Sequence, residues 1–235
     1  GSSADIIGKD IDVSVGGALV MNSSSDMVGE TINLNVQGSA TMQSSSRIEA
    51  PEVAITGRPD WVMNNNSSRI IGNVDAEFNT LVMNSNTYID ASGFGFATGE
   101  GPGAGVDAPD GTNASGSGGS HGGLGGFGAN NENRATTYGD REMPLLKGSG
   151  GGAGPGGVAG GAGGGLIKLD ITGAFTMYGD IRSNGAAGQT DGSYASGGGS
   201  GGSIYVNAAS LVGNTGTSFQ AKGGSLVMLA KGNRS

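Results

Sequence analysis

The chain has 235 residues, 51 of them glycine, with only 5% aromatic and 14% charged residues, a composition that excludes helical bundles and coiled coils. The formal net charge of -8 at pH 7 argues against a nucleic-acid partner, because binding phosphates needs clustered Lys and Arg side chains. The absence of cysteine excludes disulfides, thiolate metal sites and a cysteine nucleophile.

Four runs in the first 80 residues alternate apolar and polar residues, which is typical of strands with one buried face. Each run begins with an aliphatic residue, and the three steps between them are all 21 residues: Ile11, Ile32, Val53 and Val74. A second run in each unit ends in a methionine, with steps of 21, 21 and 20 residues: Met21, Met42, Met63 and Met83. The regular spacing indicates a repeat with one structural unit per period.

A third short run closes each unit, as "DMVG", "RIEA", "RIIG" and "YIDA". Three strands per unit, joined by Ser, Asn and Gly corners, predict an all-β fold: a right-handed parallel β-helix with three sides and about 21 residues per coil. One coil cannot bury its own apolar face, so the methionines and aliphatic residues of successive coils should stack in columns. The Ser and Asn runs should form side-chain ladders at one corner.

Two glycine-rich segments, 92–165 and 186–203, interrupt the pattern, which restarts at Ile167 after the first of them. Such segments are flexible linkers by default. The first one, however, also contains apolar residues at intervals: Phe94, Phe96, Leu124, Phe127, Tyr138, Met143, Leu145 and Leu146. We therefore predict packed insertions, with glycine supplying positive φ and close backbone approach, within one β-solenoid domain over residues 1–235.

Several stretches share one glycine-rich style, including "GSGGSHGG", "TTYGDREMPLLKGSGGG", "GGAGGGLIKLDI" and "GGGSGGSIYV". Over roughly residues 86–229 the chain resembles the glycine-rich parallel β-helix repeats of very large secreted and cell-surface proteins, including bacterial adhesins. The first four coils are similar to β-solenoids of the hemagglutinin or tailspike kind. The resemblance implies an extracellular stalk or adhesive module and transfers no catalytic residue.

Four residues are candidates for ligand contact. His121 is the only histidine and lies between glycines, where a structural hydrogen bond is favoured over a ligand contact. Tyr138 and Asp140 follow in the same insertion, in "TTYGDRE". Trp61, the only tryptophan, has the flat ring that stacks on a sugar, although a packed corner aromatic is the favoured interpretation.

Calcium is a possible cofactor of the stretch "VDAPDGTN". Asp107, Asp110 and Asn113 supply oxygen ligands at short spacing, and calcium takes six to eight oxygens in irregular loops. The spacing matches neither an EF-hand nor a GGxGxD repeat, so a turn built from Asp, Pro and Gly is favoured.

These observations predict a structural and adhesive module, a fragment of a larger secreted or cell-surface protein, rather than an enzyme. The glycine-rich insertion is the expected contact surface, because loops on a rigid scaffold usually carry recognition. The expected partner is a surface glycan or a protein, with no nucleic acid and no membrane insertion, since no apolar run reaches about 18 residues. The alternative is a tailspike-like carbohydrate-active depolymerase or a glycan-binding module, which would need two carboxylates about 5 to 10 Å apart for hydrolysis.

Overall fold

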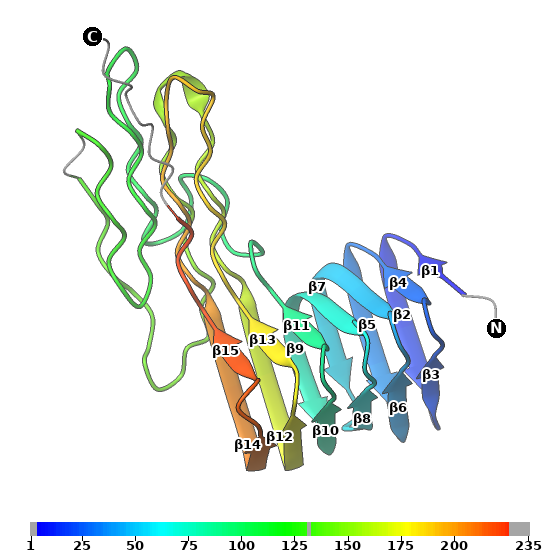
Figure 1. Ribbon diagram of the computed structural model, residues 1–235. Coiled ribbons are helices and arrows are strands. Elements are labelled where there is room, and N and C mark those ends of the chain that lie inside the picture. The colour runs from blue at the N-terminus through cyan, green and yellow to red at the C-terminus, as the bar shows by residue number, and fades with distance from the viewer. Residues whose placement is uncertain (1–3, 131–132, 226–235) are drawn as a thin grey trace. The chain divides into compact units, whose positions relative to one another are not determined.

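A computed structural model describes residues 4–130 and 133–225 of the chain, and it is all-β (Figure 1). Over these residues the fold consists of 15 strands and one 3-10 turn, Pro155–Gly157. No helix in this described part is long and apolar enough to cross a membrane. The chain divides into two compact units. Of the described residues, unit 1 comprises 4–91, 167–182 and 204–220, and unit 2 comprises 92–130, 133–166, 183–203 and 221–225.

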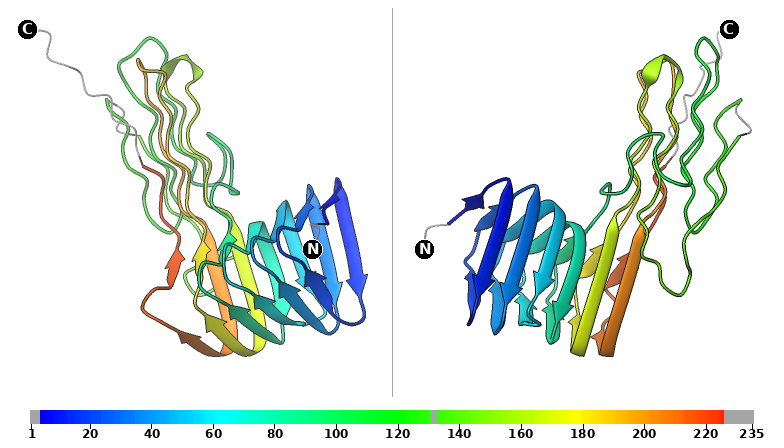
Figure 2. Two further views of the ribbon diagram at one scale, coloured as in Figure 1. Left: turned by 45° about the vertical axis from the view of Figure 1, so that its right-hand side comes forward. Right: turned by 180° about the vertical axis from the view of Figure 1, so that it is seen from behind.

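Unit 1 is a curled parallel sheet whose strands form three stacks (Figures 1 and 2). The first stack is β2 (Asp10–Val15), β5 (Thr31–Val36), β7 (Arg47–Thr56), β9 (Arg69–Phe78), β12 (Leu166–Met177) and β14 (Ser203–Gly213). The second is β3 (Leu19–Met21), β6 (Ser39–Met42), β8 (Asp60–Met63), β10 (Thr80–Met83) and the end of β12. The third is β1 (Ile6–Ile7), β4 (Asp26–Val28), the starts of β7 and β9, β11 (Tyr88–Asp90), β13 (Asp180–Arg182) and β15 (Ser218–Gln220).

The pairing register places the repeated apolar residues in columns. The first column is Ile11, Ile32, Val53, Val74 and Ile167. The second is Met21, Met42, Met63, Met83 and Met177. The third is Met27, Ile48, Ile70, Ile89, Ile181 and Phe219. The columns that the sequence predicts are confirmed, and all of their members except Phe219 are buried.

The Ser and Asn runs form one corner of unit 1, between the second and third stacks. The last residue of a run donates its hydroxyl to a backbone carbonyl earlier in the same run. Ser46 donates to Gln43 (2.6 Å), and Thr87 donates to Asn84 (2.7 Å). Between runs, the Asn64 amide donates to the Gln43 side chain (3.1 Å). The corner is therefore fixed by short polar side chains that bond to nearby backbone and to one another.

Unit 2 is built of extended glycine-rich segments that lie side by side with almost no regular strand (Figure 1). Their backbone hydrogen bonds repeat every three residues. Gly148 donates to Gly164 (2.8 Å), and three residues later Gly151 donates to Gly161 (2.8 Å). Gly161 in turn donates to Gly197 (2.9 Å), and Gly164 donates to Ser200 (2.8 Å). Three residues per repeat is the turn of a polyproline-II helix, which makes no hydrogen bonds within itself.

Successive amides of one segment consequently reach different neighbours. Next to Gly151, the Gly150 amide donates to the Glu100 carbonyl (3.0 Å), and the Gly152 amide donates to the Ser117 carbonyl (2.9 Å). The backbone amides of one segment are thus hydrogen-bonded to neighbouring segments on several sides, and little space remains between the segments. A Cβ atom added to Gly197 would lie 1.9 Å from the Ser117 carbonyl oxygen. Glycine is thus required in these segments mainly for close backbone approach.

Candidate functional site

His121 and Tyr138, both predicted as site residues, lie in contact in unit 2. Their ring centroids are 4.6 Å apart, and the Tyr138 amide donates to the His121 carbonyl at 3.0 Å. His121 is buried, and its Nδ1 lies 3.0 Å from the Gly201 carbonyl oxygen, to which it donates in the Nδ1–H tautomer. His121 therefore holds the structural hydrogen bond that the sequence favoured.

The Tyr138 hydroxyl joins the two ends of a loop. It donates to the Lys147 carbonyl (2.5 Å) and accepts a bond from Ser149 Oγ (2.8 Å). Ser149 Oγ also accepts the Gly103 amide (2.9 Å). Burial raises the pKa of Tyr138, and the bond from Ser149 only partly offsets this effect. The cluster anchors the loop 139–146 to the glycine-rich segments behind it.

A Tyr138→Phe substitution tests this anchor. It removes both bonds and leaves a carbonyl and a hydroxyl without their partner, so we expect a loss of about 1–3 kcal/mol of unfolding free energy. Because the folded-state pKa is raised, the wild-type contribution is complete below the ordinary tyrosine pKa of about 10 and declines as pH rises above it. Urea unfolding at pH 7 and at pH 11 should show a smaller difference between the two proteins at pH 11. An unchanged difference would contradict the anchoring role.

Asp140, the third predicted site residue, shapes the same loop. Its Oδ1 accepts the amides of Glu142 (2.7 Å) and Met143 (3.0 Å). The bond from Met143, followed by that from Glu142, lowers the pKa of Asp140, which therefore remains ionised at neutral pH. The carboxylate is used to form a tight turn, so the neighbouring side chains are held at defined positions.

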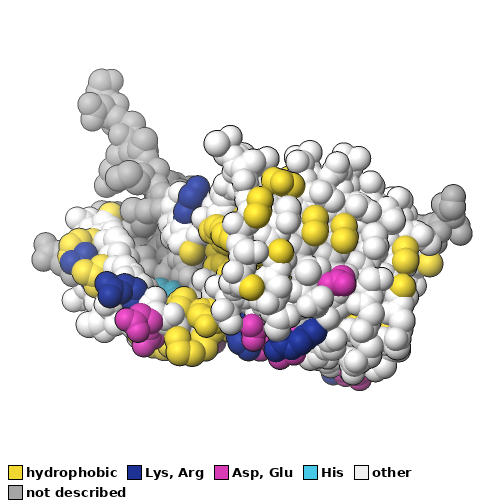
Figure 3. Space-filling model, turned by 90° about the horizontal axis from the view of Figure 1, so that it is seen from below, with side chains coloured by type: hydrophobic (Ala, Val, Ile, Leu, Met, Phe, Trp, Pro, Cys, Tyr) yellow, Lys and Arg dark blue, Asp and Glu magenta, His cyan; other side chains and the backbone are white. Residues whose placement is uncertain are grey.

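Four large apolar side chains of unit 2 face solvent. Each is about half exposed: Leu124 (55%), Phe127 (50%), Met143 (56%) and Leu146 (49%). The Arg134 guanidinium carbon lies 4.3 Å from the Phe127 ring centroid, so this ring also carries a cation–π contact. Figure 3 shows that hydrophobic side chains reach the surface in several places, some of them beside basic and acidic ones. The sequence predicts packed positions for these residues, whereas the structure places them at the surface.

The three predicted calcium ligands accept hydrogen bonds from residues that are distant in the chain. Asp107 accepts the Ala153 amide (2.7 Å), and Asp110 accepts the Gly156 amide (2.8 Å). The Asn113 carbonyl accepts the side-chain amide of Asn130 (3.1 Å). Within residues 4–130 and 133–225, no three His, Cys, Asp or Glu side chains are grouped to hold a metal ion. These contacts join segments that are 17 or 46 residues apart in the chain, so the interpretation as a turn and calcium binding both stay predictions.

Trp61 lies in the core of unit 1. It is fully buried on β8, aligned with Ala40 and Leu81 of the neighbouring strands, and its ring centroid is 5.6 Å from that of Phe78. A ligand at the surface does not reach this ring. Trp61 is therefore the packed aromatic that the sequence analysis favoured over a sugar-stacking residue.

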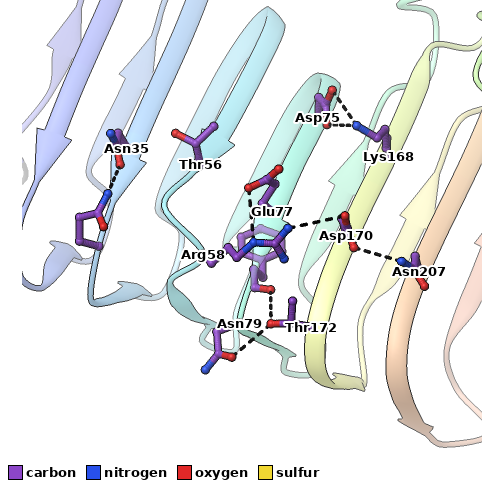
Figure 4. Close-up of polar contacts among 12 residues, drawn as sticks. Asn35, Thr56, Arg58, Asp75, Glu77, Asn79, Lys168, Asp170, Thr172 and Asn207 are labelled. Atoms are coloured by element: carbon purple, nitrogen blue, oxygen red, sulfur yellow. Dashed lines mark hydrogen bonds and ion pairs between the residues drawn. The ribbon is translucent and has the colours of Figure 1, made fainter.

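The outer face of the first stack carries a polar network that the sequence analysis did not identify (Figure 4). Arg58 lies between two carboxylates, with Nε 3.6 Å from Glu77 Oε2 and Nη2 3.8 Å from Asp170 Oδ2. Asn207 donates to the other oxygen of Asp170 (3.1 Å). Nearby, Lys168 Nζ lies 2.9 Å from Asp75 Oδ1, and this hydrogen bond is the main cause of the raised pKa of Lys168.

Further along the same face, small polar residues of β2, β5 and β7 line a shallow groove. Its polar lining includes Asp12, Ser14, Asn33, Asn35 and Thr56. Asn33 donates to Asp12 across neighbouring strands at 2.8 Å. Several polar side chains on this face of the first stack are thus paired with one another.

Comparisons with known proteins add no relative: no protein-family model matches the chain, and neither does any curated protein or solved structure.

Proposed function

We propose that this chain is an attachment module of a large secreted or cell-surface protein, and that unit 2 presents its contact surface. The observation that carries the proposal is the exposure of four large apolar side chains: Leu124, Phe127, Met143 and Leu146. Exposed apolar side chains are a common feature of interaction sites, and here they come in two pairs that are close in the chain, Leu124 with Phe127 and Met143 with Leu146. These side chains also lie on loops that connect the packed glycine-rich segments, and recognition residues are commonly found on loops of this kind.

The packing of unit 2 supports binding because it limits motion in the free state. Close backbone contacts and the hydrogen bonds of His121, Tyr138 and Asp140 hold these connections before any partner arrives. A preorganised surface loses less conformational entropy on association, so a small apolar area suffices for attachment. The proposed partner is a surface glycan or a protein.

Unit 1 is proposed to be the stalk of this module. The columns and corner described above support a right-handed, three-sided solenoid with about 21 residues per coil, in the style of glycine-rich adhesin repeats. Stacked coils give a stiff spacer whose length grows with coil number. In this proposal unit 1 provides distance and rigidity, and unit 2 provides contact.

A binding screen on immobilised glycans and purified extracellular proteins tests the proposal. We compare the wild type with a variant that combines Leu124→Ser, Phe127→Ser, Met143→Ser and Leu146→Ser. A matched control, Leu211→Ser with Val212→Ser, changes exposed apolar residues of unit 1. We expect the first variant to lose binding by at least about tenfold and the control to retain it, a difference of about 1.4 kcal/mol. Absence of wild-type binding, or equal binding by all three proteins, would contradict the proposal.

The second candidate is a carbohydrate-active depolymerase, which the neighbouring carboxylates of Glu77 and Asp170 favour. These two residues are register partners on β9 and β12, and the hydrolysis of glycans uses a carboxylate pair. Both carboxylates, however, share the Arg58 guanidinium and lie on an open face, with side chains 43% and 36% exposed. A reducing-sugar assay on capsular and matrix polysaccharides separates the candidates: release that is abolished by Glu77→Gln favours the depolymerase.

A further inference from the structure

The corner of unit 1 contains a notch that follows from chain length. Between the second and third stacks, β10 and β11 are joined by the four residues 84–87, and β14 and β15 by the four residues 214–217. Between them in the stack, β12 and β13 are joined by only Tyr178 and Gly179. The register on both sides is continuous, because Met83 pairs with Met177 and Tyr88 pairs with Asp180. The short corner therefore leaves a gap between two longer ones.

The short corner is hydrogen-bonded to the preceding one, because the Tyr178 amide donates to the Met83 carbonyl (2.7 Å) and the Asp180 amide donates to the Thr87 carbonyl (3.0 Å). Gly179 fits closely against its neighbour, since an added Cβ would lie 2.4 Å from the Thr87 carbonyl oxygen. The short corner is thus packed down onto the preceding one. A pocket is present at this place, lined by Ser85, Asn86, Tyr88, Tyr178, Gly179, Asp180, Asn214 and Gly216.

The pocket lining combines aromatic rings with neutral hydrogen-bonding groups. Tyr88 and Tyr178 are both half-buried, and Ser85, Asn86 and Asn214 are exposed at the rim. Within the described residues, the side chains of Ser85 and Asn86 and the hydroxyls of the two tyrosines make no hydrogen bond to protein. They are available to an incoming ligand, whereas Asn214 Oδ1 already accepts the Gly216 amide (3.1 Å).

Asp180, the acidic residue of the pocket, already has hydrogen-bond and ion-pair partners within the protein. Asp180 Oδ1 accepts the Ser218 hydroxyl (2.7 Å) and amide (3.0 Å), and Oδ2 accepts from Arg182 Nη2 (2.8 Å). Arg182 is itself placed over the Tyr88 ring, 4.6 Å from the centroid. A metal ion would need several free oxygens, and a phosphate would need a free cation. Neither requirement is met by Asp180 and Arg182.

We propose that this corner notch binds one residue of a neutral saccharide. A sugar ring offers apolar C–H groups to an aromatic ring and hydroxyls to amides and other hydroxyls, which is the combination present here. The small pocket beside the short corner suits one sugar ring rather than a folded peptide. This site lies within unit 1 and is independent of the attachment surface proposed for unit 2.

The first test variant lengthens the short corner so that its added residues occupy the pocket. Replacing Tyr178-Gly179 by Asn-Ser-Asn-Thr, the sequence of residues 84–87, gives the short corner the length of its neighbours. Tyr178→Ala removes only the aromatic ring, and Tyr205→Ala on β14 is the matched control. The probes are free glucose, galactose, mannose and N-acetylglucosamine and the disaccharides maltose, cellobiose, lactose and chitobiose. Binding is detected by saturation-transfer NMR and quantified by calorimetry.

We expect the wild type and Tyr205→Ala to bind at least one of these probes with the same Kd. The filled-corner protein and Tyr178→Ala should bind it at least about tenfold more weakly. If the filled corner disturbs folding, Tyr178→Ala decides the outcome. The proposal is overturned if the wild type binds none of the probes, or if the notch variants bind as well as the control does.

Discussion

Gly197→Ala is expected to unfold unit 2, whereas Gly126→Ala leaves it folded. A Cβ atom at Gly197 would lie 1.9 Å from the Ser117 carbonyl oxygen, while nothing lies within 4 Å of one at Gly126. The clash at Gly197 is with backbone on a segment that is bonded on several sides, so no side-chain rotation relieves it. Overpacking typically costs about 1–3 kcal/mol and occasionally more, and we expect the upper end here because the backbone cannot move aside. At Gly126, alanine has an effect of at most about 1 kcal/mol, and a stabilising one if it restricts only the unfolded chain.

The measurement is an NMR spectrum of protein labelled with 15N-glycine, supported by urea unfolding. In the wild type and in Gly126→Ala, the glycine amides of unit 2 should give dispersed resonances. In Gly197→Ala, most of these resonances should collapse toward random-coil positions, while those of unit 1 persist. A Gly197→Ala protein with the wild-type spectrum and midpoint would show that the glycine segments do not pack backbone against backbone.

Met42→Asp is expected to unfold unit 1. Met42 is 1% exposed and lies in its column between Met21 and Met63. The carboxylate has no partner there, and burying an unpaired charge is among the few single changes that cost more than about 4 kcal/mol. That loss is comparable to the whole stability of many domains, about 5–15 kcal/mol.

Trp61 reports on this change because it is fully buried and its strand partner is Ala40, two residues before Met42. Its fluorescence in Met42→Asp should shift to the red and lose its cooperative unfolding transition. Thr41→Asp, one residue earlier, is the control, since this side chain is on the opposite face of β6 and partly exposed. If Met42→Asp kept the wild-type fluorescence and melting temperature, the stacking register of unit 1 would be wrong.

The columns of unit 1 were predictable because a parallel stack in register converts a period in the sequence directly into neighbours in space. Ile11, Ile32 and Val53 are evenly spaced in the chain and are strand partners in the structure. The same logic would have identified the Arg58 network. Glu77 and Asp170 both come three residues after their column residue, Val74 or Ile167, and so had to be neighbours once the columns were aligned.

The arrangement of unit 2 was not predictable in the same way. Its segments recognise one another through backbone groups that every glycine shares, so the sequence carries no signal for which segment neighbours which. Gly105 and Gly150, for example, are hydrogen-bonded 45 residues apart with nothing around them to mark the pair. The prediction that apolar residues such as Phe127 are packed was wrong for a related reason: the same residue type occurs at both buried and exposed positions.

The glycine-rich segments form a packed, ordered scaffold rather than a flexible linker. Amide hydrogen exchange resolved by NMR is the decisive measurement of this packing. Gly148, Gly151, Gly161 and Gly164 donate to backbone carbonyls inside unit 2, so their amides should exchange orders of magnitude more slowly than in an unfolded chain. If all four amides exchange at unfolded-chain rates while those of unit 1 stay protected, the scaffold does not exist and the proposed contact surface has no support.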